Sequence, residues 1–284
     1  MAYQRTSRTV PEWSLLVLAL ALVGAICFPL WQWTVANDEN ATPLTAERIA
    51  RMLLGPEQIA SYACFVWANL ILLTRWLALR RERRAFHLHL LPTEEGVRIL
   101  PEDARPLQRR VSQLSERGGP FVLSNMIRLA LSKFAVSRST QDASETVRTQ
   151  AEVEVGRLAA TMSTVHYLAW AIPALGFVGT VRGIGLALTV APSIADHSLQ
   201  DFLNVTTRNL AVAFDTTLVA LLLSLVLMFL LHTIQRDEEK LVLDAQEYCL
   251  ENLITRLYDL PERTRESTTT APGADFGLEK AWPM

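Results

Sequence analysis

The sequence has little of what metal sites, disulfide frameworks and enzyme active sites require. It contains three cysteines and five histidines in 284 residues. Cys27, Cys64 and Cys249 form neither an even disulfide set nor a metal-binding spacing, so we expect them to be structural. The sequence also lacks a nucleophile elbow, a phosphate-binding loop and paired catalytic carboxylates. We therefore expect no enzyme activity, no metal and no cofactor.

The chain also lacks a large net charge of either sign. The chain has 27 Lys and Arg residues against 29 Asp and Glu residues, a formal net charge of -2. Its basic residues gather beside apolar runs and do not form a basic patch typical of nucleic-acid binding. Half of the residues are hydrophobic and the mean hydropathy is positive. This composition favours a membrane protein over a soluble one.

Four apolar runs are each long enough to cross a bilayer as a helix, which takes about 20 residues. They cover residues 13–35, 59–79, 166–191 and 209–233. The first run is too long for the apolar core of a signal peptide and has no small-residue cleavage site before Asn37. The predicted fold is therefore an all-α integral membrane protein with four transmembrane helices.

Arginines fix the expected orientation, because the second run ends in the basic stretch Arg80 to Arg84. The positive-inside rule places this stretch, and with it both chain termini, in the cytoplasm. A polar stretch continues from Gln141 to Trp170 without a proline or a glycine pair, so we expect the last two transmembrane helices to extend as long helices into the cytoplasm. The predicted segments are a cytoplasmic N-terminus 1–12, transmembrane helices 13–35 and 59–79 around a periplasmic loop 36–58, a cytoplasmic helical region 80–165, transmembrane helices 166–191 and 209–233 around a periplasmic loop 192–208, a cytoplasmic helical extension 234–260 and a disordered tail 261–284.

The third run is too polar for a helix that only faces lipid. Between Ile172 and Gly185 it carries a proline, four glycines, a threonine and an arginine. An arginine at mid-bilayer costs about 2.5–3.5 kcal/mol on insertion scales, so other protein must face this helix. We expect its glycines to allow close helix packing and its proline to form a plain kink, with a hinge as the alternative. The packing and kink residues are Pro173, Gly176, Gly179 and Gly183.

Polar positions of the third and fourth runs fall at matching depths in the membrane. The third helix leads outward and the fourth returns, so Arg182 lies two residues outward of Thr180, and Asp215 two residues outward of Thr217. Each offset is about 3 Å along the helix axis. The two threonines thus fall at one level, and the two charges at another. We predict a buried ion pair between Arg182 and Asp215, within one chain or between neighbours, with a direct part for Asp215 in ion passage as the alternative.

These two runs carry a resemblance. The pattern Ile-Pro-x-Leu-Gly-x-x-Gly-Thr-Val-x-Gly-Ile at Ile172 to Ile184, followed by Ala-Phe-x-Thr-Thr at Ala213 to Thr217, resembles the MotA/TolQ/ExbB proton channel family. The resemblance covers about residues 141–260. Four spans with an inner N-terminus are more similar to the flagellar stator subunit than to the three-span TolQ and ExbB type.

The resemblance implies a multi-pass subunit of the bacterial inner membrane. It implies a homo-oligomeric ring, a pentamer, that surrounds two copies of a single-span MotB/TolR/ExbD-like partner and couples a flow of H⁺ or Na⁺ to mechanical work. The ion pathway residues implied by position are Thr180 and Thr217, whose hydroxyls can solvate an ion. Membrane lipid is the remaining expected partner. An acid found in ExbB and TolQ five positions before the fourth-helix threonine is Val212 here.

Another interpretation stays open at the level of sequence. Threonines in membrane helices often bond only to their own backbone. The polar level would then serve helix packing, and the protein would be a passive membrane scaffold or assembly subunit without ion conduction. The identity of the ion and the process that the motor drives lie outside what the sequence indicates.

Overall fold

The computed structural model describes residues 11–36, 54–88, 91, 98–118, 121–189 and 199–258. Regular structure within these ranges is helical, apart from one isolated parallel bridge between Ile99 and Leu257. The helices are α1 Glu12–Ala36, α3 Pro56–Arg83, the 3₁₀ turn η1 Arg84–Leu88, α4 Pro101–Gly118, α5 Val122–Ser137, α6 Thr140–Thr189, α7 Leu199–Asn252 and the 3₁₀ turn η3 Ile254–Arg256. The expectation of an all-α fold is confirmed.

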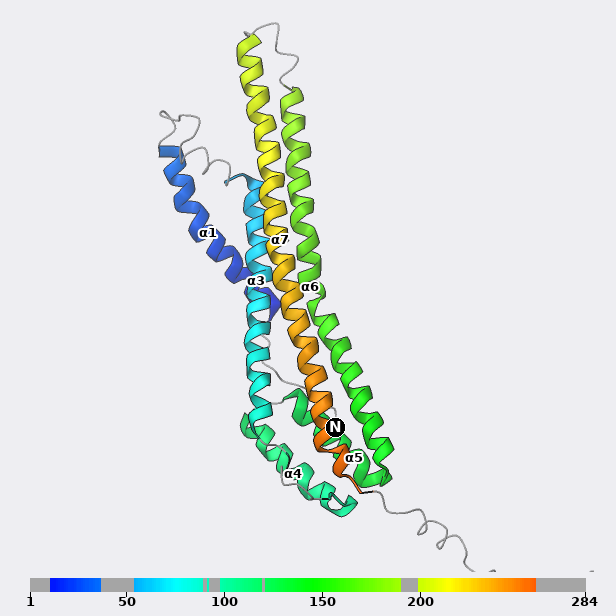
Figure 1. The fold of residues 1–284 in the computed structure, drawn as a ribbon. Helices are drawn as coiled ribbons and strands as arrows, with labels where there is room; N and C mark the ends of the chain where they lie inside the picture. Colours follow the sequence, from blue (N-terminus) through cyan, green and yellow to red (C-terminus); the bar gives the residue numbers. More distant parts are fainter. Residues whose placement is uncertain are drawn as a thin grey trace, which may run out of the picture.

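Four helices, α1, α3, α6 and α7, are long and apolar enough to cross a membrane. The two longest, α6 with 50 residues and α7 with 54, lie side by side along the length of the molecule, as Figure 1 shows. A helix of 50 residues is about 75 Å long, whereas the hydrocarbon core of a bilayer is about 30 Å thick. Both helices must therefore extend well beyond the membrane, and α6 runs from polar Thr140 through the apolar stretch without a break, as predicted.

Both ends of α7 and both ends of α3 differ from those expected. Helix α7 already begins at Leu199, so residues 199–208, expected in the outer loop, form its first turns. At the other end α7 stops at Asn252, and the chain turns through η3 so that Tyr258 can donate its N–H to the carbonyl of Ile99. Helix α3 runs from Pro56 to Arg83, longer at both ends than the apolar run. The predicted loop 36–58 and tail 261–284 lie largely or wholly outside the described residues.

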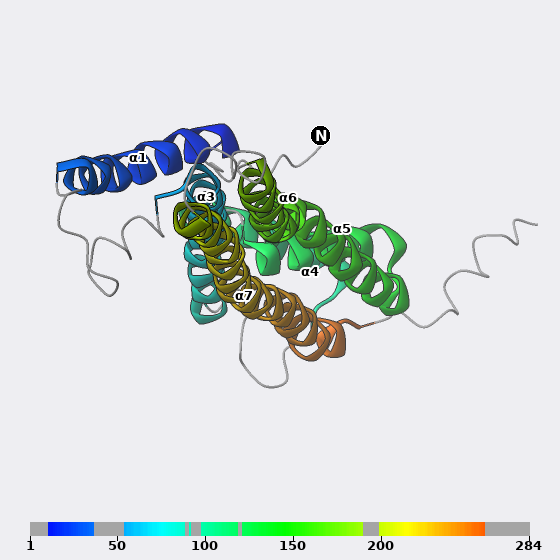
Figure 2. The same ribbon diagram turned by 90° about the horizontal axis from the view of Figure 1, so that it is seen from above.

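The molecule has two separate hydrophobic cores. One lies in the apolar half, where α3, α6 and α7 meet, and contains Leu72, Ile172 and Leu227. The other lies in the opposite half, where α4 and α5 pack against the lower parts of α6 and α7, and contains Phe134 and Val147. Seen from above, α1 is the outermost helix and packs against α3 (Figure 2).

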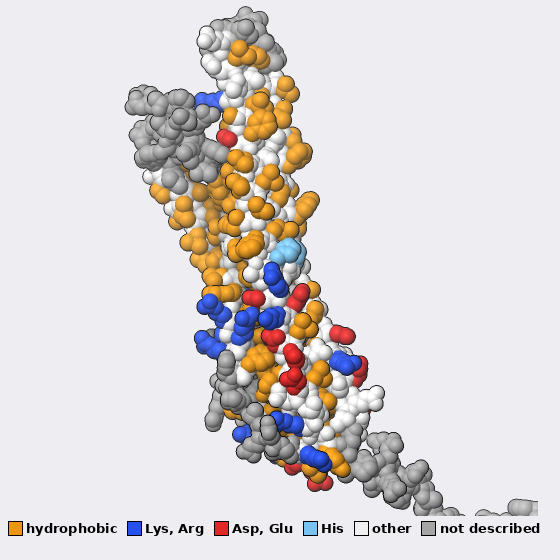
Figure 3. Space-filling view, viewed as in Figure 1, with side chains coloured by type: hydrophobic (Ala, Val, Ile, Leu, Met, Phe, Trp, Pro, Cys, Tyr) orange, Lys and Arg blue, Asp and Glu red, His pale blue; other side chains and the backbone are white. Residues whose placement is uncertain are grey.

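The surface divides in the same way along the long axis. Hydrophobic side chains cover the upper part of the face in Figure 3, and most charged side chains gather over the lower part. The exposed hydrophobic side chains include Trp170, Phe177, Leu225 and Phe229, each at least 66% exposed. Exposed apolar residues on this scale are stable in lipid and not in water. The upper half is therefore the membrane half.

Candidate functional site

Helices α6 and α7 make their closest approach along a row of glycines. A Cβ atom on Gly176 would lie 2.6 Å from the Cβ of Ala220, and one on Gly183 would lie 2.6 Å from the Cβ of Ala213. A Cβ on Gly179 would lie 2.7 Å from the hydroxyl oxygen of Thr216. No real Cβ atom approaches another heavy atom this closely, so only glycine fits at these three positions. The glycines expected to permit close packing do so, against α7 of the same chain.

Two threonine hydroxyls meet within this contact. Thr180 on α6 and Thr217 on α7 are hydrogen-bonded to each other through their Oγ1 atoms. The carbonyl oxygen of Gly176 is 3.2 Å from each hydroxyl, and the carbonyl oxygen of Ala213 is 3.3 Å from each. The structure thus places both threonines at one level, as the depth argument predicted. Both residues are half-buried in the single chain.

A third threonine belongs to the same level. Thr216 is 2% exposed, and its hydroxyl donates to the carbonyl of Ala213 across 2.7 Å while its side chain packs on Gly179. Sequence reasoning did not single it out. Thr216 fills the space that Gly179 leaves, whereas Thr217, one position on, reaches Thr180. The neighbouring threonines therefore have different contacts, one with a glycine and one with a hydroxyl.

Helix α7 also supplies a hydrogen-bond donor at the proline kink of α6. Pro173 has no N–H, so the carbonyl of Ala169, four residues earlier, loses its usual helical donor. The hydroxyl of Ser224 on α7 donates to that carbonyl oxygen across 3.1 Å. Helix α6 continues unbroken through Pro173 to Thr189. This geometry agrees with the plain kink whose freed carbonyl is satisfied by a neighbouring helix, and Ser224 is the donor that sequence reasoning did not name.

Arg182 is held by a residue that the sequence prediction missed. Its Nε lies 2.7 Å from Oε1 of Glu57, and its terminal nitrogen donates to Oε2 of the same carboxylate across 2.9 Å. Glu57 lies in the first turn of α3, directly after Pro56. The carboxylate side chain is only 11% exposed, whereas the arginine side chain is 46% exposed. This bidentate pair ties the outer end of α3 to α6.

The expected contact between Arg182 and Asp215 within one chain is therefore wrong. Helix periodicity explains why: a residue two positions from another points about 200° away around the helix. Since Thr180 and Thr217 point toward each other, Arg182 and Asp215 point away from that contact on opposite sides. Asp215 is half-buried, and within the described residues it forms no ion pair. A contact between Arg182 and Asp215 of neighbouring copies stays a prediction.

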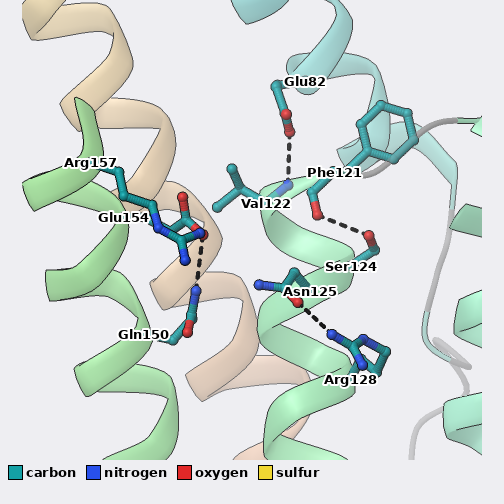
Figure 4. A network of polar contacts seen from close by, with 9 residues as sticks. All are labelled: Glu82, Phe121, Val122, Ser124, Asn125, Arg128, Gln150, Glu154 and Arg157. Atoms are coloured by element: carbon teal, nitrogen blue, oxygen red, sulfur yellow. Dashed lines mark hydrogen bonds and ion pairs between the residues drawn. The ribbon is translucent and has the colours of Figure 1, made fainter. Parts of the chain in front are cut away.

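The lower half contains a second set of polar contacts, drawn in Figure 4. Glu154 on α6 is 3% exposed, and its Oε1 accepts hydrogen bonds from Gln150 across 2.9 Å and from Arg157 across 3.2 Å. Glu82, near the end of α3, accepts the N–H of Val122 at the first residue of α5 across 2.9 Å. A carboxylate at a helix N-terminus is favourable because the free N–H groups there carry partial positive charge. Helix α3 is thus attached near its N-terminus to α6 and near its C-terminus to α5.

The described residues contain no group of three or more His, Cys, Asp and Glu side chains that could hold a metal ion. The chemistry available at the α6–α7 contact is that of uncharged hydroxyls and backbone carbonyls. Such groups can solvate a proton, a hydrated cation or water without changing their own charge.

Comparison with known proteins assigns the part of the chain that contains this contact. No curated protein and no solved structure matches the sequence. Residues 120–247, which comprise all of α5, all of α6 and most of α7, match the family model of the MotA/TolQ/ExbB proton channel family. The match includes Thr180, Thr217 and Ser224 and excludes Glu57 with the whole of α1 and α3. The described residues contain four helices that could span a membrane, and residues 120–247 are similar to the MotA/TolQ/ExbB proton channel family.

Proposed function

We propose that the chain is the ring-forming subunit of an ion-driven motor in the bacterial inner membrane. Copies of the chain, a pentamer, surround two copies of a single-span MotB/TolR/ExbD-like partner. The observation that carries this proposal is the hydroxyl pair of Thr180 and Thr217, set between two otherwise apolar membrane helices and only half-buried in the single chain. The termini and the lower halves of α6 and α7 lie in the cytoplasm in this arrangement.

The hydroxyl pair supplies one wall of an ion route. Each hydroxyl donates and accepts, so the pair can pass a hydrogen bond from one water to the next beside an acidic group of the partner. The route needs no ionisable group from this chain at that level. One charge that falls through 100 mV releases about 2.3 kcal/mol, so several H⁺ or Na⁺ ions per cycle drive a large rearrangement of ring and partner.

Ion flux into liposomes tests the proposal. Vesicles that hold the chain with its partner take up H⁺ or Na⁺ when a membrane potential is imposed. Removal of a buried hydroxyl costs about 1–3 kcal/mol, and about 1.4 kcal/mol is a factor of ten in rate. We expect Thr180→Val combined with Thr217→Val to lower the flux about tenfold or more, and the corresponding serine variants to keep most of it. Unchanged flux in the double valine variant would remove both residues from the route.

Thr233 provides the matched control. Its hydroxyl donates only to the carbonyl of Phe229 in the same helix, across 2.8 Å. Thr233→Val removes one threonine hydroxyl from α7 without touching the contact with α6. We expect the ion flux of Thr233→Val to equal that of the unmodified protein. A lower flux in this variant would show that substitution in α7 damages the helix in general.

A second candidate, a passive membrane scaffold, is favoured by one feature of the same contact. Both hydroxyls already have partners within the chain, the carbonyls of Gly176 and Ala213 and each other. In a scaffold this arrangement serves helix packing alone. Co-purification separates the two functions, because the motor retains a single-span protein with an aspartate in its membrane segment and the scaffold forms a stable complex without one.

A further inference from the structure

One face of α3 changes from apolar to basic over three helical turns. Leu73 and Leu77 are each 49% exposed, and one and two turns further on Arg80, Arg81 and Arg84 are exposed as well. Positions 73, 77, 80, 81 and 84 follow the spacing of three and four residues that places side chains on one side of a helix. In Figure 3 the hydrophobic surface ends at the level where basic side chains gather on the same side as α3.

The other charged residues at the end of α3 have partners within the protein. The Arg83 guanidinium lies 3.6 Å from the Asp237 carboxylate on α7. Glu82 accepts the N–H of Val122. These contacts direct Glu82 toward α5 and Arg83 toward α7.

Within the described residues, the arginines on the face that carries Leu77 lack such partners. The Arg80 guanidinium lies 3.5 Å from the centre of the Trp76 ring, on the same helix. Within the described part of the chain, Arg81 and Arg84 form no ion pair and contact no acidic side chain. Three guanidinium groups with five N–H donors each are thus presented beside an apolar stripe and a tryptophan.

This arrangement has the chemistry of one membrane component. A phospholipid presents apolar chains and a phosphate in the same order along the membrane normal as Leu73, Leu77 and the arginines do along α3. Guanidinium groups bind phosphate oxygens in a bidentate manner, and tryptophan is enriched at the level of lipid headgroups. Basic groups directly beside a transmembrane helix favour anionic over neutral lipid.

We propose that the exposed face formed by Leu73, Leu77, Arg80 and Arg81 on α3, together with Arg84 at the start of η1, is a binding site for an anionic phospholipid. The acyl chains lie along the leucines, and the phosphate is held by the three guanidinium groups. The lipid thereby occupies a site next to the Arg83–Asp237 contact, where α3 meets the lower part of α7. This site lies on a part of the chain outside the residues that match the proton channel family.

Lipid retention by the purified full chain tests the site. The protein is extracted in mild detergent, exchanged into detergent with added phosphatidylglycerol or phosphatidylcholine, and analysed for bound lipid by native mass spectrometry. We expect phosphatidylglycerol to be retained in preference to phosphatidylcholine. We expect Arg81→Gln combined with Arg84→Gln to weaken that retention about tenfold or more, since each basic group near the headgroup contributes to attraction of anionic lipid.

A matched control keeps the change in net charge constant. Arg105→Gln combined with Arg109→Gln removes two exposed arginines from α4, in the half of the molecule outside the membrane. This variant is expected to retain phosphatidylglycerol like the unmodified chain. The substitution of both α3 arginines by lysine is expected to retain an intermediate amount, because lysine keeps the charge and loses the bidentate geometry.

Four results would overturn the proposal. Equal retention of both lipids would show no preference for negative charge, and equal retention by the α3 glutamine variant would place the lipid elsewhere. Equal thermal stabilisation by inorganic phosphate and by phosphatidylglycerol would identify a phosphate site without a role for the leucines. A change of oligomer mass in the α3 glutamine variant, with lipid retention unchanged, would identify the face as a contact with another protein chain.

Discussion

The hydroxyl of Ser224 donates a hydrogen bond to the carbonyl oxygen of Ala169, the one carbonyl of α6 that Pro173 leaves without its helical donor. A proline therefore bends a membrane helix at a point where the neighbouring helix supplies the missing donor. In hydrocarbon an unpaired carbonyl has no water to bond with, so its cost is larger than at a protein surface. The kink and the serine are one structural unit.

The Ser224→Ala variant tests that unit. We expect it to destabilise the protein by about 1–3 kcal/mol, because the Ala169 carbonyl is left buried without a donor. In a Pro173→Ala background the backbone N–H of residue 173 returns, and the same serine substitution should cost much less. Unfolding in detergent followed by circular dichroism measures both values. Equal costs in the two backgrounds would show that Ser224 acts independently of the proline.

Ser163 offers a matched control for that experiment. Its hydroxyl bonds to the carbonyl of Ala160, three residues earlier in the same helix, across 2.9 Å. That carbonyl lies far from any proline, and the serine side chain is exposed. Ser163→Ala is therefore expected to change the free energy of unfolding by less than about 0.5 kcal/mol, the usual range for surface substitutions.

Glycine substitutions along α6 should separate positions that pack from positions that do not. Gly179→Ala places a methyl group 2.7 Å from the Thr216 hydroxyl and 2.9 Å from its Cβ. The helices must then move apart, and we expect a loss of about 1–3 kcal/mol, typical of overpacking in a close contact. Gly185→Ala meets nothing within 4 Å and is the matched control. That variant should be neutral or slightly stabilising in this single chain, because alanine has the higher helix propensity.

Gly179 also lies beside the threonine level, so its variant has a second measurable effect. A wider spacing between α6 and α7 pulls the Thr180 and Thr217 hydroxyls apart. Ion flux through liposomes should therefore fall in Gly179→Ala and stay unchanged in Gly185→Ala. A stability loss without any loss of flux would argue that the hydroxyl pair is structural.

The sequence was sufficient to predict which residues of α6 and α7 share a level, and insufficient to predict which way they point. Two antiparallel helices with a common rise per residue fix the match of Thr180 with Thr217. The same arithmetic matched Arg182 with Asp215, but rotation about the helix axis places each of them opposite the threonine contact. Once Thr180 is known to face α7, the rotation of about 200° between residues 180 and 182 directs Arg182 away from that contact. The pairing of Arg182 with Asp215 within one chain is thereby excluded.

Glu57 could not be selected from the sequence because depth alone does not determine which helix lies on the other side of α6. Two features of the sequence mark Glu57 without naming its partner. It is acidic and lies in the first turn of a helix, and it directly follows Pro56. Thr216 and Ser224 were missed for a related reason. A buried hydroxyl in a membrane helix usually bonds within its own helix, and only the contact between helices reveals Ala169 and Gly179 as its neighbours.

Cys249 should report on the integrity of the lower core. It is fully buried among the residues that join α5, α6 and α7, and burial raises the pKa of its thiol from 9.0 to about 12. The thiolate is the reactive form, so alkylation by iodoacetamide at pH 8 should be slow in the folded protein and rapid after unfolding. Rapid alkylation of the folded chain at Cys249 would contradict a closed core. Each modified cysteine is identified by mass spectrometry.

The same shift gives a pH dependence of stability with a definite sign. Because the folded pKa exceeds the unfolded pKa, the folded state holds its proton where the unfolded state has lost it. The contribution of Cys249 is therefore complete below pH 9 and is lost as the pH rises toward 12. Cys249→Ala should flatten the fall in the free energy of unfolding over that window. An equal fall in the variant would assign it to other groups.

The Arg182–Glu57 pair should couple α3 to α6 in a measurable way. Glu57→Ala leaves a half-exposed arginine without its partner, and Arg182→Ala leaves a nearly buried carboxylate without one, so the arginine substitution should be the more costly of the two. Because the arginine is partly open to solvent, we expect a coupling of about 1 kcal/mol in the double-mutant cycle. Asp215→Ala combined with Arg182→Ala should give additive losses in the isolated chain. Coupling between Arg182 and Asp215 that appears only in the assembled oligomer would instead reveal a contact between neighbouring copies, and the absence of coupling between Arg182 and Glu57 would show that their bidentate contact does not hold α3 to α6.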